Sequence, residues 1–297
     1  MHRSLLLTLL TTAIAVLARP PSRHPHSPSA AAAPGTIKCP IIFDGRIKTT
    51  TQLTDFDSYS TSPFNPDYVK GQTLKWSDII KFPSVSPSRF DDPDQHKPIE
   101  VTISDASIFM NQRGFRRAGL QFQGDSNTGS AGSKGVKTIH FSVRWDNARP
   151  LNLSHEYLNV WHETADYSAN QFNFEGGAIL GQTQLPADTW KVLDRNNRQI
   201  WAVKIEREGW QNFAITVDYE KNTLQVYYSK DDEPLTAVTS AVYNNNAGEG
   251  QFQIGILKKP TGTSDVVNSG YQSPNLDEGL LYGGLFVEDS AGGCVSL

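Results

Sequence analysis

Cysteine is almost absent from this chain: only Cys39 and Cys294 occur among its 297 residues. Two cysteines allow at most one intramolecular disulfide, and they bracket the region that we expect to fold. In a secreted protein such a pair predicts one bridge. The bridge requires the two ends of the domain to lie side by side, as the terminal strands of one sheet can. Two free buried thiols are the alternative.

Long hydrophobic runs are also missing, with one exception near the N-terminus. The apolar run from Leu5 to Leu17 follows the basic residue Arg3 and ends among small residues. It is short for a membrane span and is typical of a secretory signal peptide. We therefore expect residues 1–18 to be a signal peptide, cleaved after Ala15 or Ala18, and the protein to be secreted. An uncleaved membrane anchor is the alternative, and no membrane partner is expected.

Residues 19–36 have almost no apolar residue that could enter a core, and they are rich in Pro, Ser, Ala and His. This composition predicts a disordered spacer or propeptide. Its histidines, His24 and His26, could bind a metal, but solvated loop residues are the better interpretation. Because no later stretch resembles a linker, residues 37–297 are predicted to form a single domain.

An excess of basic charge is missing too, since 27 Lys and Arg oppose 31 Asp and Glu, for a net charge of −4. A nucleic-acid partner is therefore not expected. The sequence has no Gly-x-Ser-x-Gly elbow, His-Glu-x-x-His pair, phosphate loop or Rossmann fingerprint. With seven histidines, a histidine-built metal centre is poorly supported, and we expect no cofactor. The acidic stretch 91–94 is interpreted as a solvated turn, with a calcium site as the alternative.

What the chain does have is many short segments in which apolar and polar residues alternate. The pattern at 136–145 predicts a strand, and the pattern at 212–229 predicts a hairpin with its turn near Asn222. Further strands are predicted at 99–103, 115–123, 155–163, 250–257 and 280–288. Strands without intervening helices predict an all-β jelly-roll sandwich of two antiparallel sheets. We expect a concave groove on it, and a monomer.

Two of these strands carry polar residues suited to a groove. Alternation at 115–123 places one polar set on a shared face, with Ala118, Leu120 and Phe122 toward the core. That polar set is Arg117, Gly119, Gln121 and Gln123. In the same way one face at 153–167 is predicted to carry His155, Tyr157, Asn159, Trp161 and Glu163. Aromatic rings cover the apolar faces of sugars while amides and carboxylates bond hydroxyls, so these faces suit a polysaccharide.

Glu163 beside Trp161 is a candidate glycosidase carboxylate, with a solvated strand-end glutamate as the alternative. Hydrolysis of a glycosidic bond normally needs two carboxyl groups, roughly 5 to 9.5 Å apart depending on stereochemistry. Glu163 therefore needs a partner. The Gly/Ser-rich segment 124–135 is predicted to be a hairpin loop near the site, or else a plain flexible loop. Asn152 begins the only Asn-x-Ser/Thr acceptor and is a candidate glycosylation site.

Several longer stretches resemble one known family: CPIIFDGRI (39–47), GFRRAGL (114–120), KTIHFSVRWDNARPLNLSHEY (137–157), NTLQVYYS (222–229), GILKKPTG (255–262) and YGGLFVEDSAGGCVSL (282–297). From Cys39 onward the chain resembles the catalytic domain of fungal glycoside hydrolase family 131, in particular an ascomycete group. The resemblance implies a β-jelly roll that acts on β-1,3-, β-1,6- and β-1,4-linked glucans by an inverting reaction, and hence a β-glucan partner.

The resemblance also implies two catalytic glutamates. One falls on Glu163 and is retained, whereas the other, in an Arg-Arg-x-Glu-Leu motif, falls on Gly119. Family histidines fall on Gln211 and Gln253. The expected substrate-binding residues are Arg117, Gln121, Tyr157, Asn159, Trp161, Gln211 and Gln253. Asp125 could replace the missing acid only if the 124–135 loop folds back toward Gly119. Nothing in the sequence indicates that Glu100 or Glu156 points into the groove.

Three functions follow as hypotheses. The first is a secreted β-glucan hydrolase of the fungal cell wall, weakened or not, with Glu163 as one catalytic carboxylate. The second is a carbohydrate-binding descendant in which Gly119 has abolished hydrolysis. The third is a polysaccharide lyase on a similar jelly roll, for which Tyr157, Tyr227 or Tyr228 could supply a base.

Overall fold

The structure is a computed structural model that describes residues 35–297. The predicted signal peptide at 1–18 and nearly all of the predicted spacer at 19–36 lie outside the described residues. Within the described part, no helix has the length and apolar character needed to cross a membrane.

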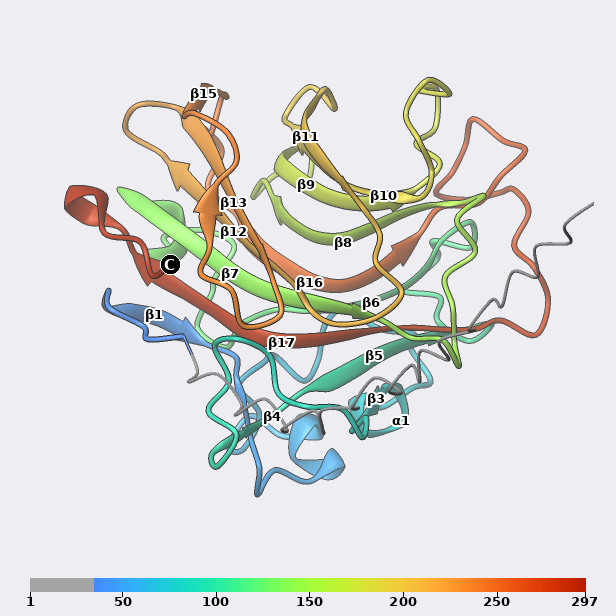
Figure 1. Cartoon of the computed structure of the whole chain (residues 1–297). Coiled ribbons are helices and arrows are strands. Elements are labelled where there is room, and N and C mark those ends of the chain that lie inside the picture. Colours follow the sequence, from blue (N-terminus) through green and yellow to red (C-terminus); the bar gives the residue numbers. More distant parts are fainter. Residues whose placement is uncertain (1–34) are drawn as a thin grey trace, which may run out of the picture. The chain divides into compact units, whose positions relative to one another are not determined.

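Two large antiparallel sheets and a small sheet of two strands make up the domain, so the predicted β-sandwich is confirmed (Figure 1). The nine-stranded sheet contains β1 (Ile41–Asp44), β3 (Ile80–Lys81), β5 (Ile99–Ser104), β7 (Val136–Trp145), β12 (Gln211–Asp218), β13 (Thr223–Lys230), β14 (Thr236–Ala237), β15 (Val242–Tyr243) and β17 (Asp277–Asp289). The six-stranded sheet contains β6 (Arg116–Leu120), β8 (Glu156–Glu163), β9 (Asn170–Gly177), β10 (Thr189–Asp194), β11 (Gln199–Lys204) and β16 (Gln251–Lys258). The remaining elements are β2 (Ile47–Lys48), β4 (His96–Lys97), α1 (Trp76–Ile79), η1 (Leu53–Asp57), η2 (Ala131–Ser133) and η3 (Ala291–Gly293).

The core lies between the two sheets and is filled by the apolar sets that alternate along the strands. Ile139 and Phe141 of β7 face it from one sheet, and Phe172 and Phe174 of β9 face it from the other. The rings of Phe141 and Phe174 meet edge to face with centroids 4.9 Å apart. This contact between the sheets is the arrangement that aromatic rings prefer, and it joins the two layers.

Strand β8 does not alternate regularly along its length, because Asn159 forms a bulge. Leu158 pairs with Glu175 of β9, and Val160 already pairs with the next residue, Phe174. An extra residue reverses the direction of the side chains that follow it. Tyr157 therefore lies in the core, with its hydroxyl 2.8 Å from Glu278 Oε2, and Leu158 takes the opposite face. The predicted shared face of Tyr157 and Trp161 is wrong.

The segment 124–135 connects β6 of the six-stranded sheet to β7 of the nine-stranded sheet. It is a crossover between layers, so the predicted hairpin loop is wrong. Asp125 anchors the crossover from inside. The hydroxyl of Ser130 donates to Asp125 Oδ1 at 2.5 Å, and the Phe252 amide donates to Oδ2 at 2.8 Å.

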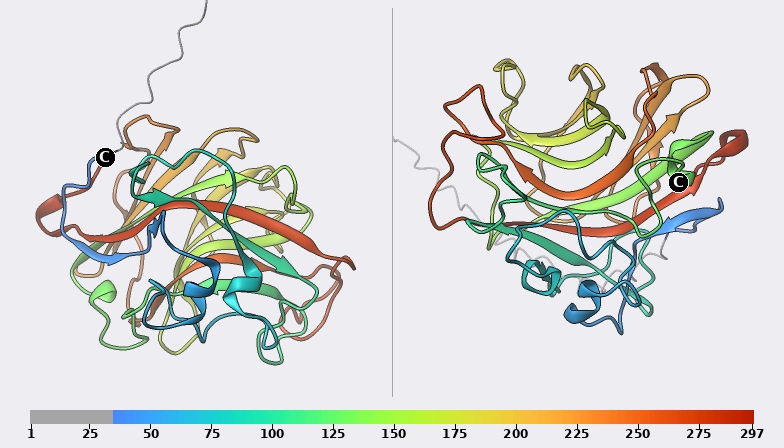
Figure 2. Two further views of the ribbon diagram at one scale, coloured as in Figure 1. Left: turned by 90° about the horizontal axis from the view of Figure 1, so that it is seen from below. Right: turned by 180° about the vertical axis from the view of Figure 1, so that it is seen from behind.

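The two ends of the domain lie side by side, as a single disulfide requires. Strand β1 pairs with the end of β17, and Figure 2 shows the C-terminus close to this first strand. The predicted bridge between Cys39 and Cys294 is confirmed, with Cα atoms 5.9 Å apart and 255 residues of separation. It closes nearly the whole domain into one covalent loop.

Replacing both cysteines by serine should lower the free energy of unfolding by about 2 to 5 kcal/mol, because the bridge restricts the unfolded chain over a long loop. Urea unfolding followed by tryptophan fluorescence measures this change. Wild-type protein unfolded with a reductant is the matched control and should behave like Cys39→Ser/Cys294→Ser. An unchanged midpoint would show that the bridge does not stabilise the fold.

Candidate functional site

A cavity of about 870 Å³ lies over the face of the six-stranded sheet that points away from the core. We call it the groove. Its floor contains Arg117, Gln121, Leu158, Trp161, Glu163, Gln251, Gln253 and Leu257. Aromatic residues outside the strands form a rim around the floor. We call them the aromatic rim: Tyr68, Phe109, Phe115 and Tyr167. Its volume is within the range of sites that hold small organic ligands.

Strand pairing explains why these floor residues meet. On β6, Ala118 and Leu120 are fully buried in the core, so Arg117, Gly119 and Gln121 point into the groove, as alternation predicts. Strand β16 lies between β6 and β8, with Gly255 opposite Gly119 and Gln253 opposite Trp161. Three strands distant in sequence thus bring together five of the predicted site residues, namely Arg117, Gln121, Trp161, Glu163 and Gln253.

Glu163 is the only carboxylate among the described residues that line the groove. Gln253 Nε2 donates to its Oε2 at 3.3 Å. Burial raises the pKa of Glu163 above its ordinary value, and the positive charge of Arg117 and the bond from Gln253 offset part of that rise. Glu163 therefore holds a proton to higher pH than an exposed glutamate does, as a general acid requires.

Arg117 is fixed between two aromatic rings. Its guanidinium carbon is 5.6 Å from the ring centroid of Phe109 and 5.8 Å from that of Trp161. Its Nη1 donates to Gln112 Oε1 at 3.1 Å, while its Nε has no partner among the described residues. The two rings and the bond to Gln112 give Arg117 a fixed orientation beside the groove, which suits a hydroxyl-rich ligand.

The space beside Gly119 is not empty. A Cβ atom at this position would lie 2.8 Å from Gln253 Oε1, closer than real Cβ contacts, and 3.7 Å from the ring of Trp161. That same Oε1 atom has no hydrogen-bond partner in the described structure, although Gln253 is only 1% exposed. The end of the Gln253 side chain would therefore have to shift to admit a side chain at position 119.

Other predicted site residues lie elsewhere. Gln211 sits at the core-facing end of β12, where its Oε1 accepts from Trp190 Nε1 at 2.9 Å, so its predicted place in the groove is wrong. Asn159 lies at the β-bulge, where its Nδ2 donates a hydrogen bond to the Gly255 carbonyl oxygen. Tyr157, in the core, cannot serve as the base of a lyase. Asn152 is exposed, and its glycosylation remains a prediction.

None of the acids considered as substitutes lines the groove. Burial raises the pKa of Asp125 to about 6, but this carboxyl group already accepts hydrogen bonds from the Ser130 hydroxyl and the Phe252 amide. Glu100 accepts two bonds from Arg149, each 2.7 Å long, and Glu156 pairs with Lys259. In the described residues no second carboxylate accompanies Glu163.

The carboxylates of Asp91 and Asp92 in the acidic turn at 91–94 accept hydrogen bonds from the protein. Asp91 Oδ2 accepts from the Ser88 hydroxyl at 2.6 Å and from the Gly284 amide at 2.9 Å. Across residues 35–297, no three histidine, cysteine, aspartate or glutamate side chains gather as a metal site would require.

The aromatic rim and two asparagines of the groove were not predicted. Tyr68 and Phe109 come from loops that precede β6 in the sequence. Their rings meet edge to face, with ring centroids 6.4 Å apart. Asn170 and Asn173 come from β9, a strand that the alternation pattern did not predict. Loop residues without alternation carry no signal of which face they cover.

A β-sandwich groove that combines a carboxylate, a tryptophan and amides has side chains suited to a carbohydrate ligand. The family model described as the glycoside hydrolase 131 catalytic N-terminal domain matches residues 41–293, and the chain belongs to this family. A search of curated protein sequences gave no match.

Two solved structures share the fold. The crystal structure of a family 131 β-glucanase catalytic domain from Podospora anserina aligns with a TM-score of 0.68 at 19% identity, covering 86% of this chain and 98% of that one. The catalytic domain of the family 131 protein from Coprinopsis cinerea aligns with a TM-score of 0.66 at 19% identity, covering 86% and 97%.

Replacing Arg117 by methionine should raise the pKa of Glu163 further, because the substitution keeps bulk but removes the positive charge that favours the carboxylate. A carbon-13 NMR titration of the glutamate carboxyl groups measures this shift, with the Glu163 signal assigned from Glu163→Gln. The matched control is Arg195→Met, which removes a charge from the same groove without acting on Glu163. An unchanged or lower pKa in Arg117→Met would contradict the assigned electrostatics.

Proposed function

We propose that this protein is a secreted β-glucan-binding member of glycoside hydrolase family 131 that has lost the two-carboxylate hydrolysis of its family. One observation carries the proposal. The groove holds a single carboxylate, Glu163, and the carboxamide of Gln253 fills the space beside Gly119 where the family resemblance places the second.

The missing carboxylate bears directly on the chemistry. Hydrolysis with inversion needs one carboxyl group to protonate the leaving oxygen and another to activate water. Losing general acid or base assistance typically lowers the rate about 10²- to 10⁴-fold. Gln253 cannot replace the lost group, because an amide neither gives up nor accepts a proton near neutral pH.

The retained features of the groove support binding. Trp161 and the rim rings of Tyr68 and Phe109 offer faces for sugar rings, and Arg117 and Gln121 offer hydrogen-bond donors. Gln121 Nε2 already donates to Gln251 Oε1 at 3.3 Å, so these amides form a connected polar strip on the floor. β-Glucan is the ligand class because the family acts on it.

Two features support secretion. The N-terminal sequence has the layout of a signal peptide, and the bridge between Cys39 and Cys294 is a bond that persists in oxidising compartments. We infer that the protein acts outside the cell, as a monomer and without a cofactor.

A second candidate function is weak hydrolysis with Glu163 alone. The observation in its favour is the raised pKa of Glu163, which suits a proton donor to the leaving oxygen. In this case water would attack without a base, so the rate would be low but would depend on Glu163.

The proposal predicts binding without products. Purified mature protein should sediment with insoluble β-1,3-glucan, and laminarin and barley β-glucan should gain no reducing ends above the buffer rate. Tyr68→Ala/Phe109→Ala should leave clearly less protein in the pellet because it removes two rings of the aromatic rim. Tyr271→Ala, an exposed tyrosine outside the groove, is the control and should still sediment. New reducing ends that vanish in Glu163→Gln would favour the second candidate.

Restoring the second acid should require two changes. Gly119→Glu alone must push aside the Gln253 carboxamide, whereas Gly119→Glu/Gln253→His restores both family residues together. We expect the double variant to hydrolyse laminarin at least about 10²-fold faster than wild type. The matched control is Gly119→Gln/Gln253→His, which has the same size without a carboxylate and should stay inactive. Equal activity in Gly119→Glu alone would show that Gln253 is not an obstacle.

A further inference from the structure

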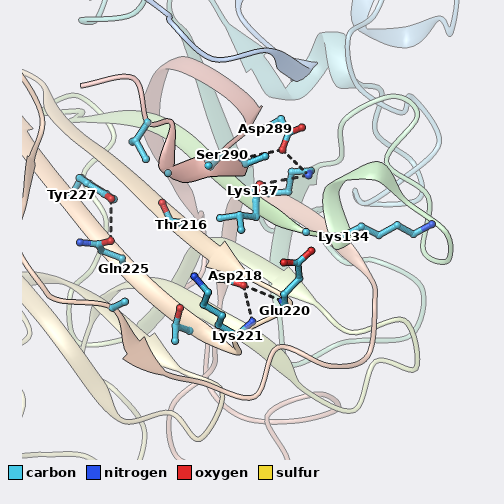
Figure 3. Close-up of a pocket in the computed structure, with 18 residues that line it drawn as sticks. Lys134, Lys137, Thr216, Asp218, Glu220, Lys221, Gln225, Tyr227, Asp289 and Ser290 are labelled. Atoms are coloured by element: carbon cyan, nitrogen blue, oxygen red, sulfur yellow. Dashed lines mark hydrogen bonds and ion pairs between the residues drawn. The ribbon is translucent and has the colours of Figure 1, made fainter.

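A second cavity, of about 750 Å³, lies on the outer face of the nine-stranded sheet (Figure 3). Strand alternation fixes its position. Ile215 and Val226 point into the core, so their neighbours Thr216, Gln225 and Tyr227 point outward and line the cavity. The groove lies on the outer face of the other sheet, and the two cavities therefore open on opposite sides of the sandwich.

The walls of this outer cavity come from two further segments. One is 134–137, which enters β7, and the other is 289–295, which follows β17 and includes η3. Gly292 and Gly293 lie in the second wall, and a Cβ atom at either would meet nothing within 4 Å. The space beside these two glycines is therefore open.

The polar groups of the outer cavity suit a ligand that is rich in hydroxyls. The Tyr227 hydroxyl donates to Gln225 Oε1 at 3.1 Å, and Thr216 Oγ1 lies 2.7 Å from Thr138 Oγ1. Thr138 is buried and also bonds Ser290. The Gln225 amide nitrogen donates to the Thr239 carbonyl oxygen at 3.2 Å. The Tyr227 hydroxyl oxygen and the second hydrogen of the Gln225 amide keep hydrogen-bonding capacity beyond these bonds. Figure 3 shows Thr216, Gln225 and Tyr227 together on the strands that form the floor.

The charges of the outer cavity balance. The lining contains three lysines and three acids, namely Lys134, Lys137, Lys221, Asp218, Glu220 and Asp289. Lys137 and Asp289 pair directly at 3.1 Å. A lining without net charge favours neither an anion nor a cation, and it points to an uncharged polar ligand.

An exposed aromatic ring stands beside the outer cavity. Tyr243 is 75% exposed and is the cross-strand partner of Thr223, which lines the cavity. Directly paired residues of antiparallel strands share a face and lie about 5 Å apart between their Cβ atoms. The Tyr243 ring is thus available at the edge of the cavity, where it can cover the apolar face of a sugar ring.

We propose that the outer cavity and Tyr243 form a second binding site for an uncharged glycan chain, distinct from the groove. The identity of that chain as β-glucan rests on the proposed function. Because the two sites open on opposite faces, one molecule can hold two chains at once. Binding at both sites would link neighbouring chains of a polysaccharide and raise the apparent affinity for the insoluble material.

Isothermal titration calorimetry of the mature protein with laminarihexaose tests the proposal. We expect wild type to bind two molecules of the hexasaccharide and Tyr243→Ala/Gln225→Ala to bind one. Tyr68→Ala/Phe109→Ala, which damages only the groove, should also bind one. Tyr271→Ala, which removes an exposed tyrosine that lines neither cavity, is the control and should still bind two.

A single site in wild type, unaffected by Tyr243→Ala/Gln225→Ala, would overturn the proposal. So would an outer site that takes inorganic phosphate or an alginate oligosaccharide and ignores laminarihexaose. If Tyr243→Ala/Gln225→Ala removes all binding while the groove variant behaves as wild type, the outer site stands and the groove proposal fails. A titration without any binding heat, repeated with the same result in a pull-down, would overturn both.

Discussion

The carboxamide of Gln253 lies between Glu163 and Gly119 on the floor of the groove. Its nitrogen donates to Glu163, and its oxygen lies 2.8 Å from the point where a Cβ atom at position 119 would be. The pairing of β16 with β6 and β8 brings one side chain close to both positions. Positions 119 and 253, where the family resemblance implies a glutamate and a histidine, therefore lie side by side in the groove. This chain has a glycine and a neutral amide there, and the amide donates a hydrogen bond to Glu163.

The same arrangement explains how a single carboxylate is tolerated in a largely buried place. Burial penalises the charged form of Glu163, and the bond from Gln253 and the charge of Arg117 reduce that penalty. Arg117 is in turn held by the rings of Phe109 and Trp161. The floor is thus a connected polar network surrounded by aromatic faces. Such a network can hold sugar hydroxyls, but it has only one group that can transfer a proton.

Much of the fold followed from the period-two pattern. It predicted the hairpin of β12 and β13, the strand β7 and the groove face of β6, because each of these strands buries one face without interruption. It failed at Asn159, where a bulge reverses the alternation, and with it the predicted place of Tyr157. It also gave no sign that Gln253 fills the space at Gly119, because that contact is set by packing between strands far apart in the sequence. The rim rings come from loops, whose positions only the folded chain determines.

The central claim is that this groove binds β-glucan without cleaving it. The most direct measurement is mass spectrometry of laminarihexaose after prolonged incubation with the protein in water enriched in heavy oxygen. Hydrolysis places one solvent oxygen in each new reducing end, so even rare cleavage leaves a mass label. The account predicts intact hexasaccharide and no labelled fragments beyond those in a protein-free control. Labelled shorter oligosaccharides that accumulate with wild type and disappear with Glu163→Gln would contradict it.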